Sequence, residues 1–213
     1  MRNAILVTDR LIIRDLPPAA GERVARVHTE NWHFHRQWEP HRPQAYFTAS
    51  VQRRILRAER RSDSMLHLWL LLRDEHGPGS SPRASWRRLP IIGSVTLSSI
   101  GMGFFRNAFL GYKMDARYTR RGYMREALLA VLELAFLDLG LHRVEANVMP
   151  RNAASLGLVG GVGFREEGLA RAYLQIQGRW EDHVHMVMLR EEWKAAGQAI
   201  RPGGLVRKKV PRP

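Results

Sequence analysis

Apolar residues recur at helical spacing along one segment more regularly than anywhere else in the chain. The positions are Met124, Ala127, Leu128, Val131, Leu132, Ala135, Phe136 and Leu139. They fit one buried helix face, and Gly140 follows where a left-handed C-cap belongs. The segment 108–114 before the helix and the alternating segment 143–149 after it are typical of strands. The pattern therefore predicts a strand, a turn, a long helix and a second strand.

The rest of the chain shows the same two patterns, helical spacing and strand-like alternation of apolar residues. Alternating or short apolar runs predict strands at 6–15, 65–72, 91–97, 173–176 and 180–189, the last two joined by a Gln177-Gly178 turn. Helical spacing predicts helices at 20–30, 49–61 and 191–196, and Asn152 can cap another. The composition of 75–90 is that of a loop. We expect an α+β fold with a mixed sheet, one domain over residues 1–196, and a flexible basic tail over 197–213.

Composition narrows the class of protein. Hydrophobic residues make up 45% and charged residues 25% of the 213 positions, which is ordinary for a globular domain. Cysteine is absent, which excludes disulfides, zinc-thiolate sites and a cysteine nucleophile. The N-terminus lacks a secretory apolar region, and the apolar run 66–72 is too short to span a bilayer. We therefore expect a cytoplasmic protein that does not associate with membranes.

Positive charge is the one unusual bulk property. The formal net charge is +14, and five basic residues without an acidic one lie in 201–213. Such a field favours polyanions, namely RNA, an acidic partner or a phosphate-rich cofactor. RNA contact through the basic surface and tail is therefore one expectation.

The turn from Thr119 to Met124, with the sequence TRRGYM, connects a predicted strand to the strongest predicted helix. The first N–H groups of a helix lack intrahelical acceptors and lie at its positive dipole end, which suits phosphate. Arg117, Arg120 and Arg121 add charge, and Gly122 lets a ligand approach the backbone. Local geometry thus predicts a phosphate-binding turn.

Two longer segments carry a family resemblance. LGYKMDARYTRRGYMREAL, residues 110–128, resembles the coenzyme-binding core of the GCN5-related N-acetyltransferases (GNAT). Residues 142–184 are similar to the ribosomal-protein alanine N-acetyltransferase branch, and TDRLIIRDL and ENWHFHRQWEP upstream agree with it. The resemblance covers about residues 5–193. It implies a GNAT fold, in which a mixed, mostly antiparallel sheet flanked by helices splays between two central strands, and it implies acetyl-CoA as co-substrate.

The resemblance also implies coenzyme contacts. The strand residues Tyr112, Lys113 and Met114 would hold the pantetheine arm and the thioester through their main chain. The pyrophosphate would lie on the turn formed by Thr119, Arg120, Arg121, Gly122, Tyr123 and Met124. Relatives begin this turn with Gln or Arg and end it with Gly or Ala, so Thr119 and Met124 depart from the pattern. The departures concern side chains, whereas main-chain N–H groups bind most of the phosphate in such turns.

Without cysteine we expect direct attack of the acceptor amine on acetyl-CoA. By the resemblance, Ser155 protonates or stabilises the leaving sulfur and Asn152 contacts the pantetheine arm. Alternatively, Asn152 only caps the helix and Ser155 lies in its first turn.

The general base is less defined by the sequence. Some relatives carry a glutamate where this chain has Leu174. Glu145, Tyr173 and Glu39 are candidates, with Asn147 beside Glu145 on one strand face, and a water-relayed path is an equal alternative. Trp38, with Trp32 and Phe34, either lines the acceptor channel or belongs to the core. The pairs His33/His35 and His183/His185 lack further ligands at a convincing interval, so we expect no metal site.

Three functions follow from these patterns. The branch resemblance favours acetylation of a protein N-terminus, with Ala or Ser first and a ribosomal protein as the bearer. The net charge of +14 adds contact with ribosomal RNA as an expectation. An α-amino group titrates near about 8 and a lysine near about 10.4, so the α-amine needs less help from a base. Acetylation of a small-molecule amine is the nearest alternative. A non-catalytic RNA- or protein-binding module on the same fold is the third.

Overall fold

The computed structural model describes residues 5–73, 87–197 and 206–208 of the chain. In this part, nine strands form one sheet in the order β7-β8-β6-β5-β4-β3-β2-β1-β9. The strands are β1 (Ile5–Val7), β2 (Leu11–Arg14), β3 (Leu66–Leu72), β4 (Ile91–Gly101), β5 (Asn107–Met114), β6 (Arg143–Val148), β7 (Arg165–Ile176), β8 (Arg179–Leu189) and β9 (Val206–Lys208). Neighbouring strands are antiparallel except β5 and β6, which are parallel.

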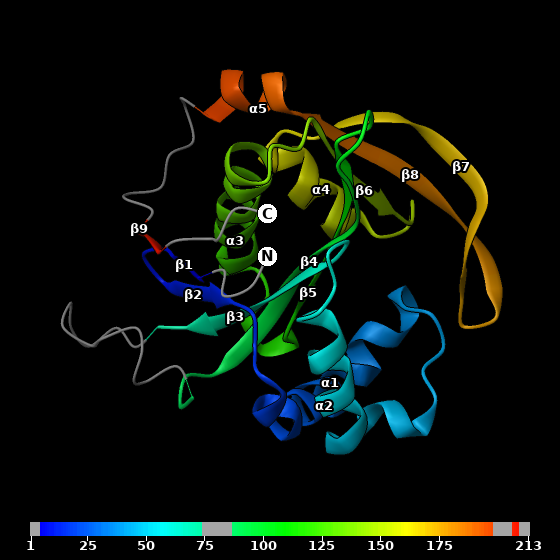
Figure 1. Ribbon diagram of the computed structural model, residues 1–213. Coiled ribbons are helices and arrows are strands. Elements are labelled where there is room, and N and C mark those ends of the chain that lie inside the picture. The colour runs from blue at the N-terminus through cyan, green and yellow to red at the C-terminus, as the bar shows by residue number, and fades with distance from the viewer. Residues whose placement is uncertain (1–4, 74–86, 198–205, 209–213) are drawn as a thin grey trace.

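Helices cover both faces of the sheet (Figure 1). They are α1 (Gly21–His35), α2 (Ala49–Glu59), α3 (Tyr123–Glu133), α4 (Ala153–Val162) and α5 (Arg190–Gly197), with 3-10 turns η1 (Pro18–Ala20), η2 (Arg36–Trp38), η3 (Gln44–Phe47) and η4 (Ala116–Tyr118) and a π-helical turn η5 (Leu134–Asp138). The larger core lies between the sheet and α3 with α4, and a smaller one lies under α1 and α2. We call these two sides the α3 face and the α1 face. No helix in the described ranges is long and apolar enough to cross a membrane.

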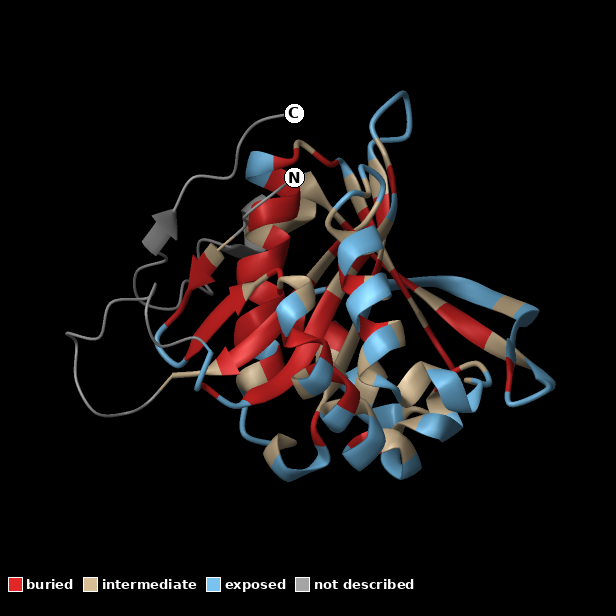
Figure 2. Ribbon diagram, turned by 60° about the horizontal axis from the view of Figure 1, so that its bottom comes forward, coloured by how far each residue is buried: buried red, intermediate tan, exposed pale blue. Residues whose placement is uncertain are grey.

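The alternation along the central strands decides which side chains reach each face. Val144, Ala146 and Val148 of β6 belong to the core under α3. Glu145 and Asn147 therefore point to the α1 face, because successive side chains of a strand alternate. Figure 2 shows the buried positions running through α3 and the central strands, whereas β7 is exposed along nearly its whole length.

The two central strands part where the resemblance predicts a splay. β5 and β6 pair only between 107–109 and 143–145. Further along, residues 110–114 stay paired with β4 and residues 146–148 with β8, but not with one another. The facing main-chain edges of β5 and β6 are thus open beyond Phe109 and Glu145. The predicted mixed sheet with a central splay is confirmed.

Some predicted boundaries are wrong. The segment 6–15 is a hairpin of β1 and β2, because Thr8 turns the chain by accepting from Leu11 N at its Oγ1 and donating its own N–H to Leu11 O. The helix expected at 20–30 continues to His35, which places Trp32 and Phe34 in α1. The strand predicted at 173–176 is the C-terminal part of a longer strand, β7, which begins at Arg165.

The strongest predicted helix ends as expected but not regularly. After Glu133 the chain widens into the π-turn η5, and Gly140 then adopts φ 71° while Leu141 N donates to Ala135 O. Most of the predicted 75–90 loop lies outside the described residues. The same holds for most of the 197–213 tail, although residues 206–208 form β9 against β1.

Candidate active site

The turn after β5 is anchored by a buried carboxylate. Asp115 accepts from Arg117 N, Nε and Nη2 at 2.9, 3.0 and 2.6 Å, and from Asn31 Nδ2 at 3.1 Å. Burial raises the pKa of Asp115, but these hydrogen bonds outweigh it and hold the pKa below its ordinary value. Arg117 also bonds Glu30 at 2.9 Å. Arg117, which the sequence predicted to add charge to the turn, is thus paired with the carboxylates of Asp115 and Glu30 and fixes the turn.

The following residues form a cradle of unpaired main-chain N–H groups. Arg120 and Gly122 adopt φ 59° and 78°, and the first helical hydrogen bond runs from Glu126 N to Gly122 O at 3.1 Å. Within the described ranges, no acceptor lies in reach of the amides of residues 120–125. A Cβ on Gly122 would lie 3.4 Å from Arg10 Nη2. An anion can thus meet several N–H groups at the positive end of α3.

Side chains of the predicted turn take different roles. Thr119 Oγ1 donates to Ala116 O at 3.0 Å, and Met124 is buried in the core under α3. The side chains of Thr119 and Met124, which depart from the family pattern, thus contact other parts of the protein, and the main-chain N–H groups of the turn stay available. The Tyr123 ring lies under the Arg10 guanidinium at 4.5 Å, and Arg120 and Arg121 are exposed.

A set of hydrogen bonds from the β1–β2 hairpin, here called the brace, holds the cradle, and the sequence pattern does not indicate it. Glu126 in the first turns of α3 accepts from Thr8 Oγ1 at 2.5 Å, Arg10 N at 3.0 Å and Arg10 Nε at 2.7 Å. Arg10 Nη1 also donates to Arg121 O at 3.0 Å. The segment TDR had matched the family pattern, but nothing in one sequence connects it to a residue 116 positions away.

Two hydroxyl groups meet on the α3 face of the splay. Tyr112 Oη hydrogen-bonds Ser155 Oγ and donates to Ser155 O at 3.3 Å. Burial raises the pKa of Tyr112 to about 12, against the opposing effect of its bond to Ser155. Asn152 Oδ1 accepts from Ser155 N at 3.1 Å, so the helix-cap role is present. Tyr112 was expected to act through its main chain, whereas its side chain reaches from β5 to α4.

On the α1 face, Glu39 and Lys113 neutralise each other. Glu39 is 8% exposed, and its carboxylate lies 2.6 Å from Lys113 Nζ and 3.6 Å from Arg42. Burial lowers the pKa of Lys113, partly offset by Glu39. Because the carboxylate is already paired with two cations, it is poorly placed to take a proton from an acceptor.

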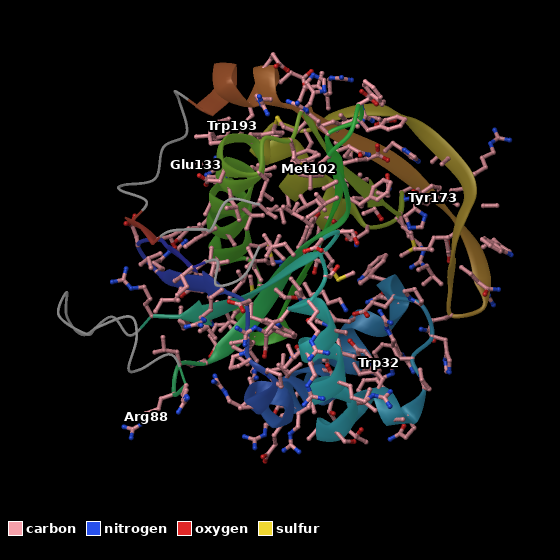
Figure 3. All side chains as sticks on the ribbon, in the orientation of Figure 1. Trp32, Arg88, Met102, Glu133, Tyr173 and Trp193 are labelled. Carbon is pink, nitrogen blue, oxygen red and sulfur yellow. The ribbon has the colours of Figure 1, made fainter. Side chains whose placement is uncertain are left out.

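The aromatic residues predicted to line the acceptor channel lie in different surroundings. Trp38 of η2 stacks against the Arg151 guanidinium at 4.9 Å, and Arg151 bonds Glu181 of β8 at 3.0 Å. Trp38 thus lies between α1 and the β7–β8 hairpin. Trp32 packs edge-on against Phe47 of η3 at 5.1 Å, as part of the helical layer (Figure 3).

The remaining predicted residues gather in one polar cluster on the α1 face, at the opening of the splay. His185 Nδ1 lies 2.9 Å from Glu145 Oε1, and Asn147 Nδ2 donates to Tyr173 Oη at 3.0 Å. The Tyr173 ring stands edge-on to His185 at 5.1 Å. Burial, with Glu145, raises the pKa of Tyr173. Leu174 lies next to the cluster in sequence and is 42% exposed.

A β-bulge turns Tyr173 toward this cluster. The pairing of β7 with β8 shifts register between Ala170 and Leu174. Ala172 takes φ 46° there, and its N–H donates to Asp182 Oδ1 at 2.8 Å. Bulges re-aim side chains near functional sites, and Figure 3 shows Tyr173 pointing from the hairpin toward the body of the sheet.

The two histidine pairs do not form a joint metal site. His183 Nδ1 bonds Glu181 O at 3.1 Å, while His185 bonds Glu145. His35 bonds Met114 O at 2.8 Å, and His33 is exposed. No group of three metal-ligating side chains was found among the described residues.

The chain was compared with known proteins. A family model described as an acetyltransferase (GNAT) domain matches residues 10–165. The probable N-acetyltransferase YjcK of Bacillus subtilis is 36% identical over 84% of this chain and 93% of its own length. The ribosomal protein uS5-alanine N-acetyltransferase of Escherichia coli is 31% identical over 88% and 92%.

Solved structures show the same likeness. The ribosomal-protein-S5-alanine acetyltransferase from Vibrio fischeri superimposes with a TM-score of 0.77 at 26% identity, over 89% of this chain and 98% of that one. Mycobacterium smegmatis RimJ in complex with CoA-disulfide gives 0.74 at 25%, over 92% and 98%. The likeness therefore covers about nine-tenths of this chain and nearly all of each solved structure.

Proposed function

We propose that this chain, which belongs to the GNAT family of acetyltransferases, acetylates the N-terminal α-amino group of a protein that begins with Ala or Ser. The family recognised from the sequence is confirmed, and the chain is an N-acetyltransferase. Members of this family use acetyl-CoA, and one similar structure holds a coenzyme A derivative. What the proposal adds is the acceptor and the residues that act on it.

The open edges of β5 and β6, with different chemistry on the two sheet faces, are the observation that carries the proposal. We place the thioester between these edges, where unpaired main-chain groups can hold it, with the pyrophosphate on the amides of residues 120–125. The hydroxyls of Tyr112 and Ser155 lie on the α3 face, and Glu145, Asn147 and His185 lie on the α1 face. The amine then attacks from the α1 face while the sulfur leaves beside the hydroxyls.

The reaction needs no further reactant. The amine nitrogen bonds the thioester carbon, the C–S bond breaks, and the nitrogen loses a proton. The thiolate gains a proton, which we assign to the hydroxyl pair of Ser155 and Tyr112; this pair recovers it from solvent. Amine and acetyl-CoA thus give amide and free coenzyme A.

Three observations support a protein α-amine as acceptor. Similar proteins that cover nearly the whole chain are named for acetylating an alanine of ribosomal protein uS5. An α-amino group, with a pKa of about 8, needs only a weak base, as this site offers. The net charge of +14 repels polycations at long range and favours an acceptor near RNA. We accordingly propose a ribosomal protein as acceptor, contact with ribosomal RNA through basic surface residues, and a cytoplasmic location.

The test uses the full chain, acetyl-CoA and peptides that begin with Ala, Ser or Pro, with spermidine as a small-amine control. We expect thiol release and the mass of one acetyl group on the Ala and Ser peptides alone. Acetylation of spermidine alone would favour the small-molecule alternative. Absence of acetyl-CoA binding in calorimetry would favour a non-catalytic module and refute the proposal.

A further inference from the structure

Two buried polar atoms without partners belong to neighbouring residues of the polar cluster. Asn147 of β6 and His185 of β8 are directly paired across the antiparallel ladder, so their side chains share the α1 face. Asn147 uses its Nδ2 for Tyr173, and His185 uses its Nδ1 for Glu145. Asn147 Oδ1 and His185 Nε2 are buried and have no hydrogen-bond partner.

Such atoms are costly to leave unsatisfied. A buried polar group without a partner costs about 1–3 kcal/mol, so each such group calls for an explanation, and a catalytic role is one of them. Both atoms are acceptors when the imidazole carries its proton on Nδ1, the tautomer that a bond to the Glu145 carboxylate favours. Their natural complement is a group with several N–H donors, such as a primary amine.

The position of these two residues in the sheet suits an amine that attacks the thioester. Glu145 is the last residue of β6 paired with β5, opposite Phe109, and Asn147 lies two residues further along the open edge. The acceptor atoms therefore lie where the splay opens on the α1 face. The charged and titratable groups around His185 are Glu145 and Arg143 from β6, Tyr173 from β7 and His183 from β8.

We propose that His185 is the general base of the acetyl transfer, with Asn147 Oδ1 as the second acceptor for the incoming amine and Glu145 as the residue that positions the imidazole. This assignment rests on the proposed function. The ammonium group of the acceptor gives one proton to His185 Nε2, and the neutral amine attacks the thioester carbon. As the C–S bond breaks, the nitrogen loses its second proton to solvent, and the thiolate is protonated by the Ser155–Tyr112 hydroxyl pair, which regains its proton from solvent. The imidazolium formed faces the carboxylate of Glu145 and returns its proton to solvent after coenzyme A leaves.

The main test is the pH dependence of kcat/KM for His185→Gln. General bases contribute about 10²–10⁴-fold to rate, and we expect a loss in kcat of this size with the acetyl-CoA affinity unchanged. In the wild type, the rise of kcat/KM with pH is set by a group on the enzyme. Two acceptor peptides that differ in α-amino pKa should therefore give a rise at the same pH. In His185→Gln this rise should move with the pKa of the peptide, because only the free amine then reacts.

His142→Gln is the matched control. His142 also lies near a carboxylate, Glu191 at 3.4 Å, but it is 53% exposed and outside the cluster. We expect wild-type kinetics from it. Glu145→Gln should lose part of the rate and keep an enzyme-dependent rise. Wild-type turnover in His185→Gln would overturn the assignment. So would a rise of kcat/KM in that variant at a pH that does not change with the pKa of the peptide.

A second measurement does not depend on turnover or on the variant folding. Imidazole nitrogen NMR of the wild-type protein with coenzyme A should show neutral His185 protonated at Nδ1, with an Nε2 signal that shifts when L-alaninamide is added. Protonation at Nε2, or no shift with alaninamide, contradicts the amine site. If the wild type acetylates no peptide but this shift is seen, the proposed acceptor is wrong and the amine site stands.

Discussion

The brace between the β1–β2 hairpin and α3 makes a quantitative prediction for Glu126→Gln. The Glu126 carboxylate is 8% exposed and accepts three hydrogen bonds, one of them from the Arg10 guanidinium. Glutamine keeps the shape and one oxygen for Thr8 and Arg10 N. Its NH₂ group, however, would face Arg10 Nε, so two donors meet where an ion pair was.

The size of the effect follows from burial. Breaking a fully buried ion pair costs about 3–5 kcal/mol, and one hydrogen bond to a charged group contributes about 1.5–3 kcal/mol. Arg10 is 45% exposed, so water can solvate its freed guanidinium. We therefore expect a loss of about 2–3 kcal/mol, which is within the range for one charged hydrogen bond and does not exceed the lower limit for a fully buried ion pair. For a domain of this length it corresponds to a fall in Tm of roughly 4–12 °C.

The assay combines thermal unfolding with calorimetry of acetyl-CoA binding. Arg10 also holds the carbonyl of Arg121 in the cradle, so the Kd for acetyl-CoA should rise together with the fall in Tm. Arg26→Ala is the control, because its pair with Glu22 is 3.7 Å long and exposed on both sides, and such pairs contribute little. A Tm and a Kd for Glu126→Gln equal to those of Arg26→Ala would show that the brace is not what holds the turn.

Four further outcomes are expected. Gly122→Glu should abolish acetyl-CoA binding in calorimetry, because its carboxylate would meet the pyrophosphate where φ 78° already disfavours a side chain. Ser155→Ala and Tyr112→Phe should each lower kcat in a thiol-release assay and leave the Kd for acetyl-CoA within about threefold, roughly 0.6 kcal/mol. The pKa of Asp115 is lowered, so its contribution is complete above its ordinary pKa and is lost as the pH falls through the folded value; Asp115→Asn should flatten this acid limb in unfolding titrations. A Cβ on Gly160 meets no atom within 4 Å, so Gly160→Ala should stabilise α4 by up to about 1 kcal/mol in denaturant unfolding, and a simultaneous loss of acetyl-CoA affinity would show that the coenzyme needs the bare backbone.

Periodic patterns predicted the elements that lie in the body of the fold. The helix that begins near Met124 and the strand at 143–149 each bury one face, so the apolar pattern predicts them. Both are present in the structure, as α3 and β6. The 6–15 segment failed because Thr8 closes a turn with its own side chain inside an otherwise strand-like pattern. Local side-chain bonding of this kind competes with a strand and leaves no trace in hydrophobicity.

The site shows a different limit. The sequence indicated that Glu145 and Asn147 share a strand face, and that His183 and His185 do so too. It did not contain the register that pairs Asn147 with His185 across β6 and β8. The imidazole therefore appeared only as half of a weak metal pair, and the carboxylate as a base without a partner. Two residues that are two positions apart share one face of a strand. Which residue of the next strand lies beside them is decided by the register of the sheet.

The separation of groups by sheet face has a consequence for the proposed reaction. A base and an acid that touched each other would exchange a proton and cancel, but here the open edges of β5 and β6 lie between them. His185 and Glu145 approach the splay from β8 and β6 on the α1 face, and the hydroxyls of Tyr112 and Ser155 from β5 and α4 on the α3 face. In the proposed reaction the bound thioester and the amine would lie between the two groups, each of which exchanges its proton with solvent. This arrangement agrees with direct attack in a ternary complex.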